Sequence, residues 1–521
     1  MRSSSNALKT KASKANKRTP TFTCELPLRV GFSVGRILAA RIEAARQAYN
    51  AALGEALRRM RLVRQSVWFA KAMATPRGNK QERQAHFRAA RAQHDFSDSA
   101  LQRYGISLRS SAGVRTWIGK HLGAHEVQHL ATRAYRAVNE YLLGLHGRPR
   151  FKGKGRMHSV EGKGPGSGLR WKNNRVVWGD LVLRPIIAHQ DPVVRYALSC
   201  RVKYIRIVRR RVHLRTRWYV QLVCEGQPYR KPKNHIGKGV VGLDLGPSTV
   251  AVVSAKEAVL QPFCPEVIEP QREIRRLQRQ IDRQRRANNP QNHLPDGSIK
   301  PGRKRWVVSQ RQKACEAALG DLHRRLAASR KTSHGRLVNR ILGMGDTFRL
   351  EKVSCRAFQR TFGRSVGRRA PGMFVGHLSR KADSAGGTAI AFPTRTTALS
   401  QRCHCGRRAK KPLSLRWHHC PNCGADAQRD LYSAFLARFV YETEDGFLLD
   451  AGQASLAWPG AEPLLRAAYE QGRQNNKPAS GSVLRPSPAR GQSGSHAQGA
   501  LAPTRVLQAE VKSQEAIPAQ A

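Results

Sequence analysis

Four cysteines occur as two closely spaced pairs in the C-terminal half of the chain. They are Cys403, Cys405, Cys420 and Cys423. Four thiolates can close a tetrahedral shell around Zn²⁺, and the short loops within each pair let neighbouring sulfurs face one ion. The spacing therefore predicts a structural zinc ribbon over residues 400–425, with four separate buried thiols or two disulfides as the alternatives. Because the first pair has only one intervening residue, His404, His418 or His419 could replace one sulfur as a ligand.

Three acidic residues follow one another in the order Asp, Glu, Asp, each beside an apolar segment. They are Asp244, Glu351 and Asp430. A carboxylate in an apolar segment is costly unless it is paired or bound to a cation. Each acid alone has an ordinary explanation, as a turn residue or a helix cap. Together, three converging carboxylates can hold two Mg²⁺ ions, which activate water and stabilise charge on the leaving oxygen of a phosphodiester.

The chain of 521 residues carries 94 Lys and Arg against 34 Asp and Glu, a formal net charge of +60. Such a charge opposes compaction unless a polyanion neutralises it, so the composition indicates a nucleic-acid partner. An anionic membrane is the competing partner, but the sequence has no apolar run long enough to span a bilayer and no secretory signal. We therefore expect a cytoplasmic protein without membrane association. The remaining cysteines fit small core residues of a reducing compartment.

The N-terminal half changes character twice along the chain. Residues 1–20 are basic and rich in serine, and we expect a disordered arm. Residues 21–32 predict a strand, residues 33–146 a helical lobe, and residues 147–236 further strands rich in Val, Ile, Tyr and Trp. This order predicts a β-barrel interrupted by a helical lobe. The polar face of the first long helix predicts a phosphate-facing surface. Its arginines are Arg36, Arg41, Arg46, Arg58 and Arg59.

The C-terminal half alternates strands with basic helices, so the whole chain is expected to be a multidomain α+β protein. The expected elements are a strand at 240–243, a basic hairpin of helices within 271–330, a short helix at 334–343, a strand at 347–353 and a helix from Asp430. Residues 444–470 predict a helical segment. Residues 471–521 are dominated by Gln, Ser, Gly, Pro and Ala and predict a disordered tail.

The stretches VVGLDLGPSTVAVVS, RLEKVS and SQRCHCGRRAKKPLSLRWHHCPNCGADAQRDLYSA together resemble the TnpB (OrfB) family of insertion-sequence proteins, relatives of the type V CRISPR effector nucleases. The resemblance covers roughly residues 21–438. It implies a wedge-type barrel, a recognition lobe, and an RNase H-like RuvC domain over 237–399 and 426–443 with a zinc-bearing module inserted before the last acid. The implied catalytic residues, which would bind magnesium, are Asp244, Glu351 and Asp430.

The implied activity is RNA-guided, Mg²⁺-dependent cleavage of double-stranded DNA beside a short target-adjacent motif, by a transposon-encoded prokaryotic protein associated with the nucleoid. Guide RNA would be both cofactor and partner. The family usually has Asp-Arg-Asp and then x-Asn-Ala-Ala, whereas this chain has Gln428 in place of the first Asp and Tyr432 in place of the Asn. Asp426 is a possible substitute for Asp430, but Asp430 keeps the helix register of the motif.

Two alternatives to an RNA-guided nuclease remain. One is an RNA-guided DNA-binding protein with a weakened cleavage site, which the changes at Gln428 and Tyr432 favour. The other is a transposase that acts on the ends of its own element. Transposases with an RNase H fold usually order their acids Asp, Asp, Glu, which this chain does not follow.

Overall fold

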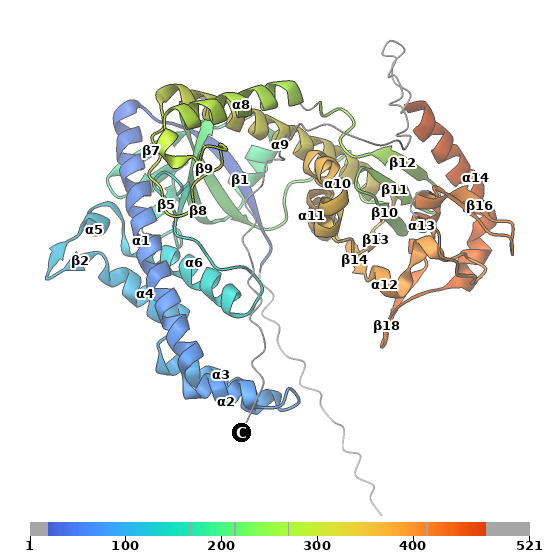
Figure 1. The fold of residues 1–521 in the computed structure, drawn as a ribbon, viewed down its shortest axis with the longest axis horizontal. Coiled ribbons are helices and arrows are strands. Elements are labelled where there is room, and N and C mark those ends of the chain that lie inside the picture. Colours follow the sequence, from blue (N-terminus) through green and yellow to red (C-terminus); the bar gives the residue numbers. More distant parts are fainter. Residues whose placement is uncertain (1–18, 167, 213–214, 269, 413–414, 476–521) are drawn as a thin grey trace, which may run out of the picture. The chain divides into compact units, whose positions relative to one another are not determined.

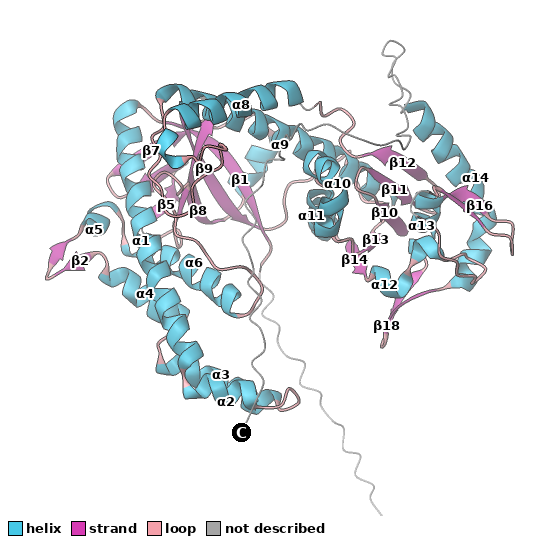
Figure 2. Ribbon diagram, in the orientation of Figure 1, coloured by secondary structure: helices cyan, strands magenta, loops and turns pink. Residues whose placement is uncertain are grey.

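Figure 1 shows a computed structural model of the chain, which describes residues 19–166, 168–212, 215–268, 270–412 and 415–475. The predicted disordered arm and tail lie outside these residues, apart from 19–20 and 471–475. Sheets and long helices occur together in the described residues (Figure 2), as the expected α+β class requires. Among the described helices, none has the length and apolar character needed to cross a membrane.

The first sheet has seven antiparallel strands in the order β4-β8-β9-β1-β7-β6-β5. Its strands are β1 (Thr21–Arg29), β4 (Ser159–Glu161), β5 (Leu169–Lys172), β6 (Arg175–Trp178), β7 (Leu181–Pro185), β8 (Val202–Val212) and β9 (Arg215–Glu225). Most of β1 pairs with β9, and its last two residues, Leu28 and Arg29, pair with β7. β1, which precedes the helical region in the chain, therefore pairs with strands that follow that region. Closure of this sheet into a barrel stays a prediction.

The helical region lies between β1 and β4. Its helices are α1 (Phe32–Gln65), α2 (Val67–Ala74), α3 (Lys80–Gln93), α4 (Asp98–Ser107), α5 (Trp117–His121) and α6 (Ala124–Leu142). A short hairpin of β2 (Ser110–Ser111) and β3 (Val114–Arg115) connects α4 to α5. Helix α1 buries an apolar face that includes Leu38, Ile42 and Leu53, and it packs against α6. Burial of this face, spaced at the helical period, explains why so long a helix forms.

The arginines on the polar face of α1 are mostly ion-paired within the protein, and their contact with phosphate stays a prediction. Four of these five arginines form ion pairs within the protein, so their charge is partly neutralised there. The pairs and their N–O distances are Arg41–Asp180 (2.6 Å), Arg46–Glu43 (2.6 Å), Arg58–Glu55 (2.8 Å) and Arg59–Glu55 (2.7 Å). Arg41 is buried and also donates a hydrogen bond to the Trp178 carbonyl oxygen, so it joins α1 to the first sheet. The acids that pair with these arginines lie three or four residues away on α1 or, for Asp180, far away in the sequence. The basic face of the helix alone therefore does not reveal them.

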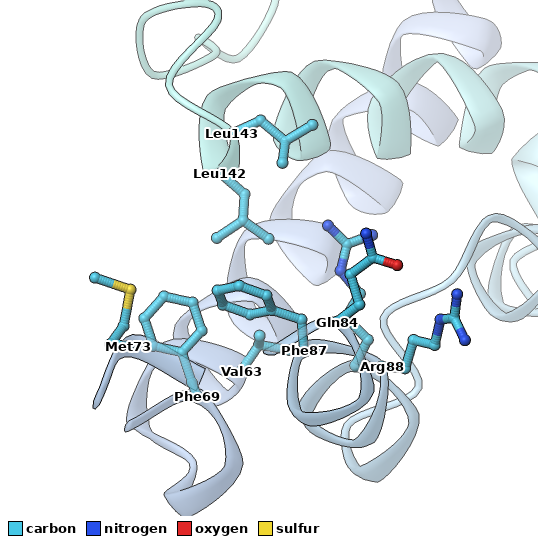
Figure 3. A pocket seen from close by; sticks show the side chains of 9 residues that line it. Val63, Phe69, Met73, Gln84, Phe87, Arg88, Leu142 and Leu143 are labelled. Carbon is cyan, nitrogen blue, oxygen red and sulfur yellow. The ribbon is translucent and has the colours of Figure 1, made fainter. Parts of the chain in front are cut away.

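An apolar pocket of about 370 Å³ opens where the ends of α1 and α6 meet α2 and α3 (Figure 3). Phe69 and Phe87 lie on one side and Leu142 on the other, with Gln84 and Arg88 as polar neighbours. None of the acids or cysteines singled out in the sequence lines this pocket.

The second sheet has five strands in the order β12-β11-β10-β13-β14. They are β10 (Val240–Leu245), β11 (Thr249–Val253), β12 (Ala258–Pro262), β13 (Thr347–Glu351) and β14 (Thr388–Phe392). Strands β10, β11 and β12 are antiparallel neighbours, whereas β13 runs parallel to β10 and β14 parallel to β13. Helices α9 (Gln310–Met344) and α11 (Pro371–Ser384) share one core with the side chains of Val241, Leu243 and Leu245. Helix α13 (Arg429–Ala437) contacts the sheet at β10 and β11.

Gly242 allows α13 to approach β10 closely. A Cβ atom at this position would lie 1.9 Å from the Ala434 carbonyl oxygen of α13, so only glycine fits without displacement. We expect Gly242→Ala to lower the free energy of unfolding by about 3 kcal/mol, at the upper end of the range for overpacking. Gly320→Ala is the matched control, because a Cβ on Gly320 in α9 meets nothing within 4 Å. That change should stabilise the helix by about 0.5–1 kcal/mol. Denaturant unfolding of both variants measures the difference, and equal effects would contradict the close contact.

The predicted basic hairpin differs from the structure in its second helix. Helix α8 (Gln271–Ala287) pairs with α9, and Ile274, Leu277 and Leu322 form their small core. The connection contains the 3₁₀ turn η1 (Pro290–Asn292). The expected short helix at 334–343 is the end of α9, which continues unbroken to Met344. The prediction of a break was wrong because residues 331–334 contain no proline or glycine and Ser333 and His334 are buried against the core.

The predicted helical segment at 444–470 is also partly wrong. Strands β17 (Val440–Thr443) and β18 (Gly446–Leu449) form a hairpin there, and α14 (Ala451–Asn475) follows and extends beyond the expected end. Gly446 has a φ of 130°, a conformation that side chains rarely adopt, so it permits the tight turn. Residues 471–475 are therefore helical, although the sequence predicts the start of a disordered tail there.

Candidate metal centres

The three predicted acids lie on neighbouring elements of the second sheet. Asp244 is near the end of β10, Glu351 is the last residue of β13, and Asp430 is the second residue of α13. The parallel register that pairs Leu243 with Leu350 brings Asp244 beside Glu351. Asp244 also points to the same face as Gly242, because side chains two residues apart share a face of a strand. Helix α13 covers that face, and its first turn supplies Asp430.

The carboxylates lie close enough to influence one another. Burial, together with the negative charges of Asp430 and Glu351, raises the pKa of Asp244 well above its usual range. Burial also raises the pKa of Glu351. Three ionised carboxylates this close together and partly buried repel one another unless a cation binds between them. Within the described part of the chain their ligand atoms do not all lie within 4.8 Å of one another. Two metal ions about 4 Å apart suit ligands that are spread more widely than those around one ion.

Glu351 is held by the segment that leads into the ribbon. Its Oε1 atom accepts hydrogen bonds from the Leu399 backbone nitrogen (3.2 Å) and from the Thr397 hydroxyl (3.3 Å). These donors belong to α12 (Thr394–Thr397) and to the 3₁₀ turn η2 (Leu399–Gln401). Thr397 is almost fully buried, so the contact is shielded from water. Neither donor gave a signal in the sequence, because both are more than forty residues from Glu351.

Asp430 is positioned by the N-terminus of α13. The Gln428 side chain caps this helix by accepting a hydrogen bond from the Leu431 backbone nitrogen at 2.8 Å. The carboxylate of Asp430 remains partly accessible and lies 3.7 Å from a guanidinium nitrogen of Arg416 and 3.7 Å from one of Arg429. The Gln at position 428, which departs from the family motif, therefore has a structural role as a helix cap.

Asp426, the alternative to Asp430, has a different environment. It lies in β16 (Asp426–Gln428), which pairs with β15 (Trp417–His419). Its Oδ1 atom accepts a hydrogen bond from the Trp417 indole nitrogen at 2.7 Å and lies 3.4 Å from His419 Nδ1. The acids that chiefly raise the pKa of Asp244 are Asp430 and Glu351. The structure thus brings Asp430, and not Asp426, to the other two acids.

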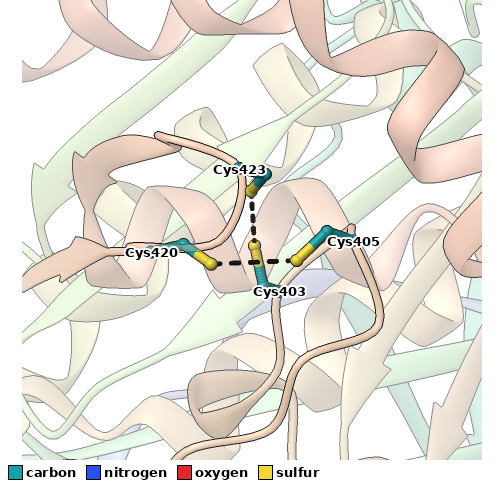
Figure 4. A group of neighbouring side chains, drawn as sticks. All are labelled: Cys403, Cys405, Cys420 and Cys423. Atoms are coloured by element: carbon teal, nitrogen blue, oxygen red, sulfur yellow. Dashed lines mark hydrogen bonds between the residues drawn. The ribbon is translucent and has the colours of Figure 1, made fainter.

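The four predicted cysteines come together as one group (Figure 4). Their sulfur atoms all lie within 4.8 Å of one another. Cys403 lies 3.4 Å from Cys423, and Cys405 lies 3.7 Å from Cys420, so each contact joins the two pairs. Zinc–sulfur bonds of about 2.3 Å in a tetrahedron place sulfurs roughly 3.8 Å apart. The donor set and its spacing therefore fit Zn²⁺.

The nearby histidines have other partners, and none belongs to the ligand group of four cysteines in the described residues. His404 Nδ1 lies 2.9 Å from the Tyr432 hydroxyl, and its ring stacks on Trp458. His418 stacks on Tyr432 with ring centroids 4.0 Å apart. His419 is the exposed partner of Asp426. In the described residues the clustered ligand atoms are those of the four thiols, and their assignment as zinc ligands stays a prediction.

Tyr432 links the cysteine group to α13. It is fully buried, and its hydroxyl lies 3.2 Å from Cys403 Sγ and accepts a hydrogen bond from the His404 backbone nitrogen at 2.9 Å. Tyr432 lies two residues after Asp430, on the same short helix. In the sequence, Tyr432 stands out only as a departure from the family motif. Its role as a connection between the two centres depends on contacts with Cys403 and His404, which precede it by almost thirty residues.

Residues 372–436 match the protein-family model described as "Cas12f1-like, TNB domain". This segment runs from α11 into α13 and contains the four cysteines and Asp430. No curated protein sequence matches the chain. The similar solved structures include two at 12% sequence identity. A Cas12f1–sgRNA–target DNA complex has a TM-score of 0.37, covering 80% of this chain and 98% of that chain. A CRISPR-Cas12f ternary complex has a TM-score of 0.24, covering 78% of this chain and 81% of that chain.

Proposed function

We propose that this protein is an RNA-guided DNA endonuclease of the TnpB type, encoded by a transposon, which hydrolyses phosphodiester bonds with Mg²⁺. The observation that carries the proposal is the convergence of Asp244, Glu351 and Asp430 at one end of the second sheet. The sheet order, with three antiparallel strands followed by two parallel ones, supports an RNase H-like domain. The cysteine group precedes the third acid and lies inside segment 372–436, which matches the Cas12f1-like TNB domain. This position supports a nuclease related to the TnpB and Cas12f proteins.

The three acids would hold the magnesium ions, which when bound activate water and stabilise charge on the leaving oxygen. Glu351 is pre-oriented by Thr397 and Leu399, so it does not have to rearrange when a cation arrives. Asp430 is fixed by a capped helix whose distance from β10 is set at Gly242. Burial and the charges of Asp430 and Glu351 raise the pKa of Asp244, and a bound cation would favour its ionised form. Each residue thus contributes a ligand that the fold has already placed.

The partners in this proposal are a guide RNA and double-stranded DNA with a short target-adjacent motif. The guide would read the target by base pairing, while the protein would contact the sugar-phosphate backbone of the RNA–DNA heteroduplex. A net charge of +60 supplies the cationic surface that such a complex needs. A chain with this charge is not expected to remain free of RNA in the cell.

A binding protein without cleavage is the second candidate, and it rests on the changes at Gln428 and Tyr432. Both residues have structural roles, one as the cap of α13 and one as the connection to the cysteine group. Neither role removes a carboxylate from the acidic centre. The order Asp, Glu, Asp argues against a transposase that joins its own element ends.

The direct test begins with RNA that co-purifies with the full chain. Sequencing this RNA should identify one enriched species that carries a variable guide end, and that species defines a matched DNA target. The complex should cleave the matched target with Mg²⁺ and leave an unmatched target intact. Specific binding of the matched target without cleavage would favour the second candidate. Cleavage that ignores the guide would contradict the proposal.

RNA binding should depend strongly on salt. Each neutralised phosphate of single-stranded RNA releases counterions, so the logarithm of the affinity should fall with the logarithm of the salt concentration, with a slope of about −0.7 per contact. We expect a loss of at least about a thousandfold between 50 and 200 mM salt, as for proteins with many phosphate contacts. Filter binding at several salt concentrations measures the slope. A nearly flat response would mean that the basic residues are solvated and do not contact phosphate.

A further inference from the structure

A second pocket, which is polar, lies beside β10, β13 and α13, the three elements that carry the acids. Its volume is about 340 Å³, and it is lined by Val240, Arg349, Arg438, Phe439, Tyr441, Asp450 and Gln453. Val240 starts β10, whereas Asp244 is four residues further along, which is about 13 Å in a strand. Arg438 caps the C-terminal end of α13, eight residues after Asp430, or about 12 Å in a helix. Arg349 is nearer, since it precedes Glu351 by two residues on β13, or about 7 Å in a strand. The pocket lining contains none of the three acids.

Two arginines dominate this pocket, and neither is neutralised by the described part of the protein. Among the described residues, no ion pair joins a carboxylate to the Arg349 or Arg438 guanidinium, and burial alone shifts the pKa of each. Arg349 donates one hydrogen bond, from Nη1 to the Arg438 carbonyl oxygen at 2.7 Å. The Nε atom of Arg438 is buried and has no hydrogen-bond partner. Burial lowers the pKa of both arginines.

Each arginine has a structural role that explains part of its position. The contact of Arg349 places a cation at the C-terminal end of α13, where it interacts favourably with the helix dipole. The guanidinium carbon Cζ of Arg438 lies 5.2 Å from the centre of the Phe439 ring, in a cation–π contact. These contacts leave most of the ten guanidinium N–H donors of the pair unused. Two partly desolvated positive charges in one pocket are costly unless an anion joins them.

The remaining lining fits an anion. Tyr441 and Gln453 add a hydroxyl and an amide, both able to donate hydrogen bonds. Asp450 is the acid of the pocket, but its Oδ1 atom accepts a hydrogen bond from the Gln453 backbone nitrogen, at the start of α14. Its carboxylate therefore serves as the cap of that helix. The cavity is at the lower end of the size range of small-ligand sites, so it suits a phosphate group with little attached to it.

We propose that this pocket binds a phosphate group, held by the guanidinium groups of Arg349 and Arg438. The planar fork of an arginine makes two parallel hydrogen bonds to phosphate oxygens, which suits it to this role better than a lysine. The phosphate can come from a nucleic-acid backbone or from a free nucleotide, and both present the same oxygens. The site does not depend on the proposed cleavage activity, because it contains none of the three acids.

The test uses the full chain and inorganic pyrophosphate as the probe. Pyrophosphate should raise the unfolding temperature of the native protein relative to sodium chloride at equal ionic strength, since a ligand that binds only the folded state stabilises it. Arg438→Gln should remove most of this shift, because it deletes a guanidinium whose buried Nε has no hydrogen-bond partner in the described protein. Arg283→Gln is the matched control. It removes one positive charge from an exposed position on α8 and should keep the full shift.

Equal shifts in Arg438→Gln and Arg283→Gln would overturn the proposal, because pyrophosphate would then bind elsewhere on a basic surface. The absence of any shift in the native protein would overturn it as well. If Arg438→Gln does not fold, Arg438→Lys replaces it. Lysine keeps the charge but not the planar fork, so a reduced shift supports the site and an unchanged shift contradicts it.

Two further measurements identify the source of the phosphate. Adenosine monophosphate replaces pyrophosphate in the unfolding experiment, and a short single-stranded RNA is titrated against each variant. If the source is a nucleic-acid backbone, Arg438→Gln should weaken RNA binding and reduce the salt slope by about 0.7. If the source is a nucleotide, adenosine monophosphate should stabilise the native protein but not Arg438→Gln, with RNA affinity unchanged. These readouts involve no cleavage, so they stand or fall separately from the proposed nuclease activity.

Discussion

Replacing Asp244, Glu351 or Asp430 with its amide should reduce DNA cleavage to background while RNA binding remains intact. Each replacement keeps the size of the side chain and removes one negative ligand from the acidic centre. The remaining two acids cannot then hold a pair of divalent cations in place, so the chemical step should be lost. Because the three residues act as a unit, a double replacement should be little worse than a single one. Cleavage of a guide-matched target with Mg²⁺, beside RNA binding by the same variants, measures both effects.

Asp426→Asn is the matched control for Asp430→Asn, because the two acids are four residues apart and only one reaches the acidic centre. Asp426 accepts a hydrogen bond from Trp417, and an amide oxygen can accept the same bond. We therefore expect this variant to retain most of the activity. If Asp426→Asn abolishes cleavage and Asp430→Asn does not, the assignment of the third acid is wrong. Loss of RNA binding in any of the three variants would mean that the acids support the fold instead of the chemistry.

Removing zinc should unfold the segment 400–428 and abolish cleavage even though all three carboxylates remain. Structural zinc contributes on the order of 10 kcal/mol to the small domains that bind it, far more than the ribbon's short strands can provide. We expect about one zinc per chain, and its loss in Cys403→Ser or Cys420→Ser. Metal analysis and limited proteolysis of the ribbon measure the two effects.

Cys315→Ser is the control for these substitutions, because Cys315 is a partly buried cysteine of α9 that lies outside the cysteine group. It should leave the zinc content and the proteolysis pattern unchanged. Full activity of a well-folded protein that contains no zinc would rule out a structural metal. Loss of zinc in Cys315→Ser would point to a general effect of thiol replacement.

The sequence predicted which acids and which cysteines come together better than it predicted the contacts that hold them in place. The cysteine pairs and Asp430 are close together in the chain, so their spacing alone predicts a ribbon followed by a helix. Asp244 and Glu351 stand in short apolar strands, and the parallel register of β10 and β13 then brings them together. The donors to Glu351 and the partner of Arg41 are distant in sequence, and local patterns give no information about such contacts. The unbroken α9 and the β17–β18 hairpin show the same limit, because burial of Ser333 and His334 and the turn at Gly446 decided them.

The contact of Tyr432 with the cysteine group limits how the ribbon can be exchanged between relatives. Replacing residues 400–425 alone with those of a relative would bring a foreign loop against Tyr432 and remove the His404 ring nitrogen that lies 2.9 Å from its hydroxyl. A buried hydroxyl without a partner costs about 1–3 kcal/mol, and here the strain would fall on the first turns of α13. The segment that can be exchanged is therefore longer than the ribbon. It includes α13, the helix that carries Asp430, so the ribbon and α13 must be replaced together.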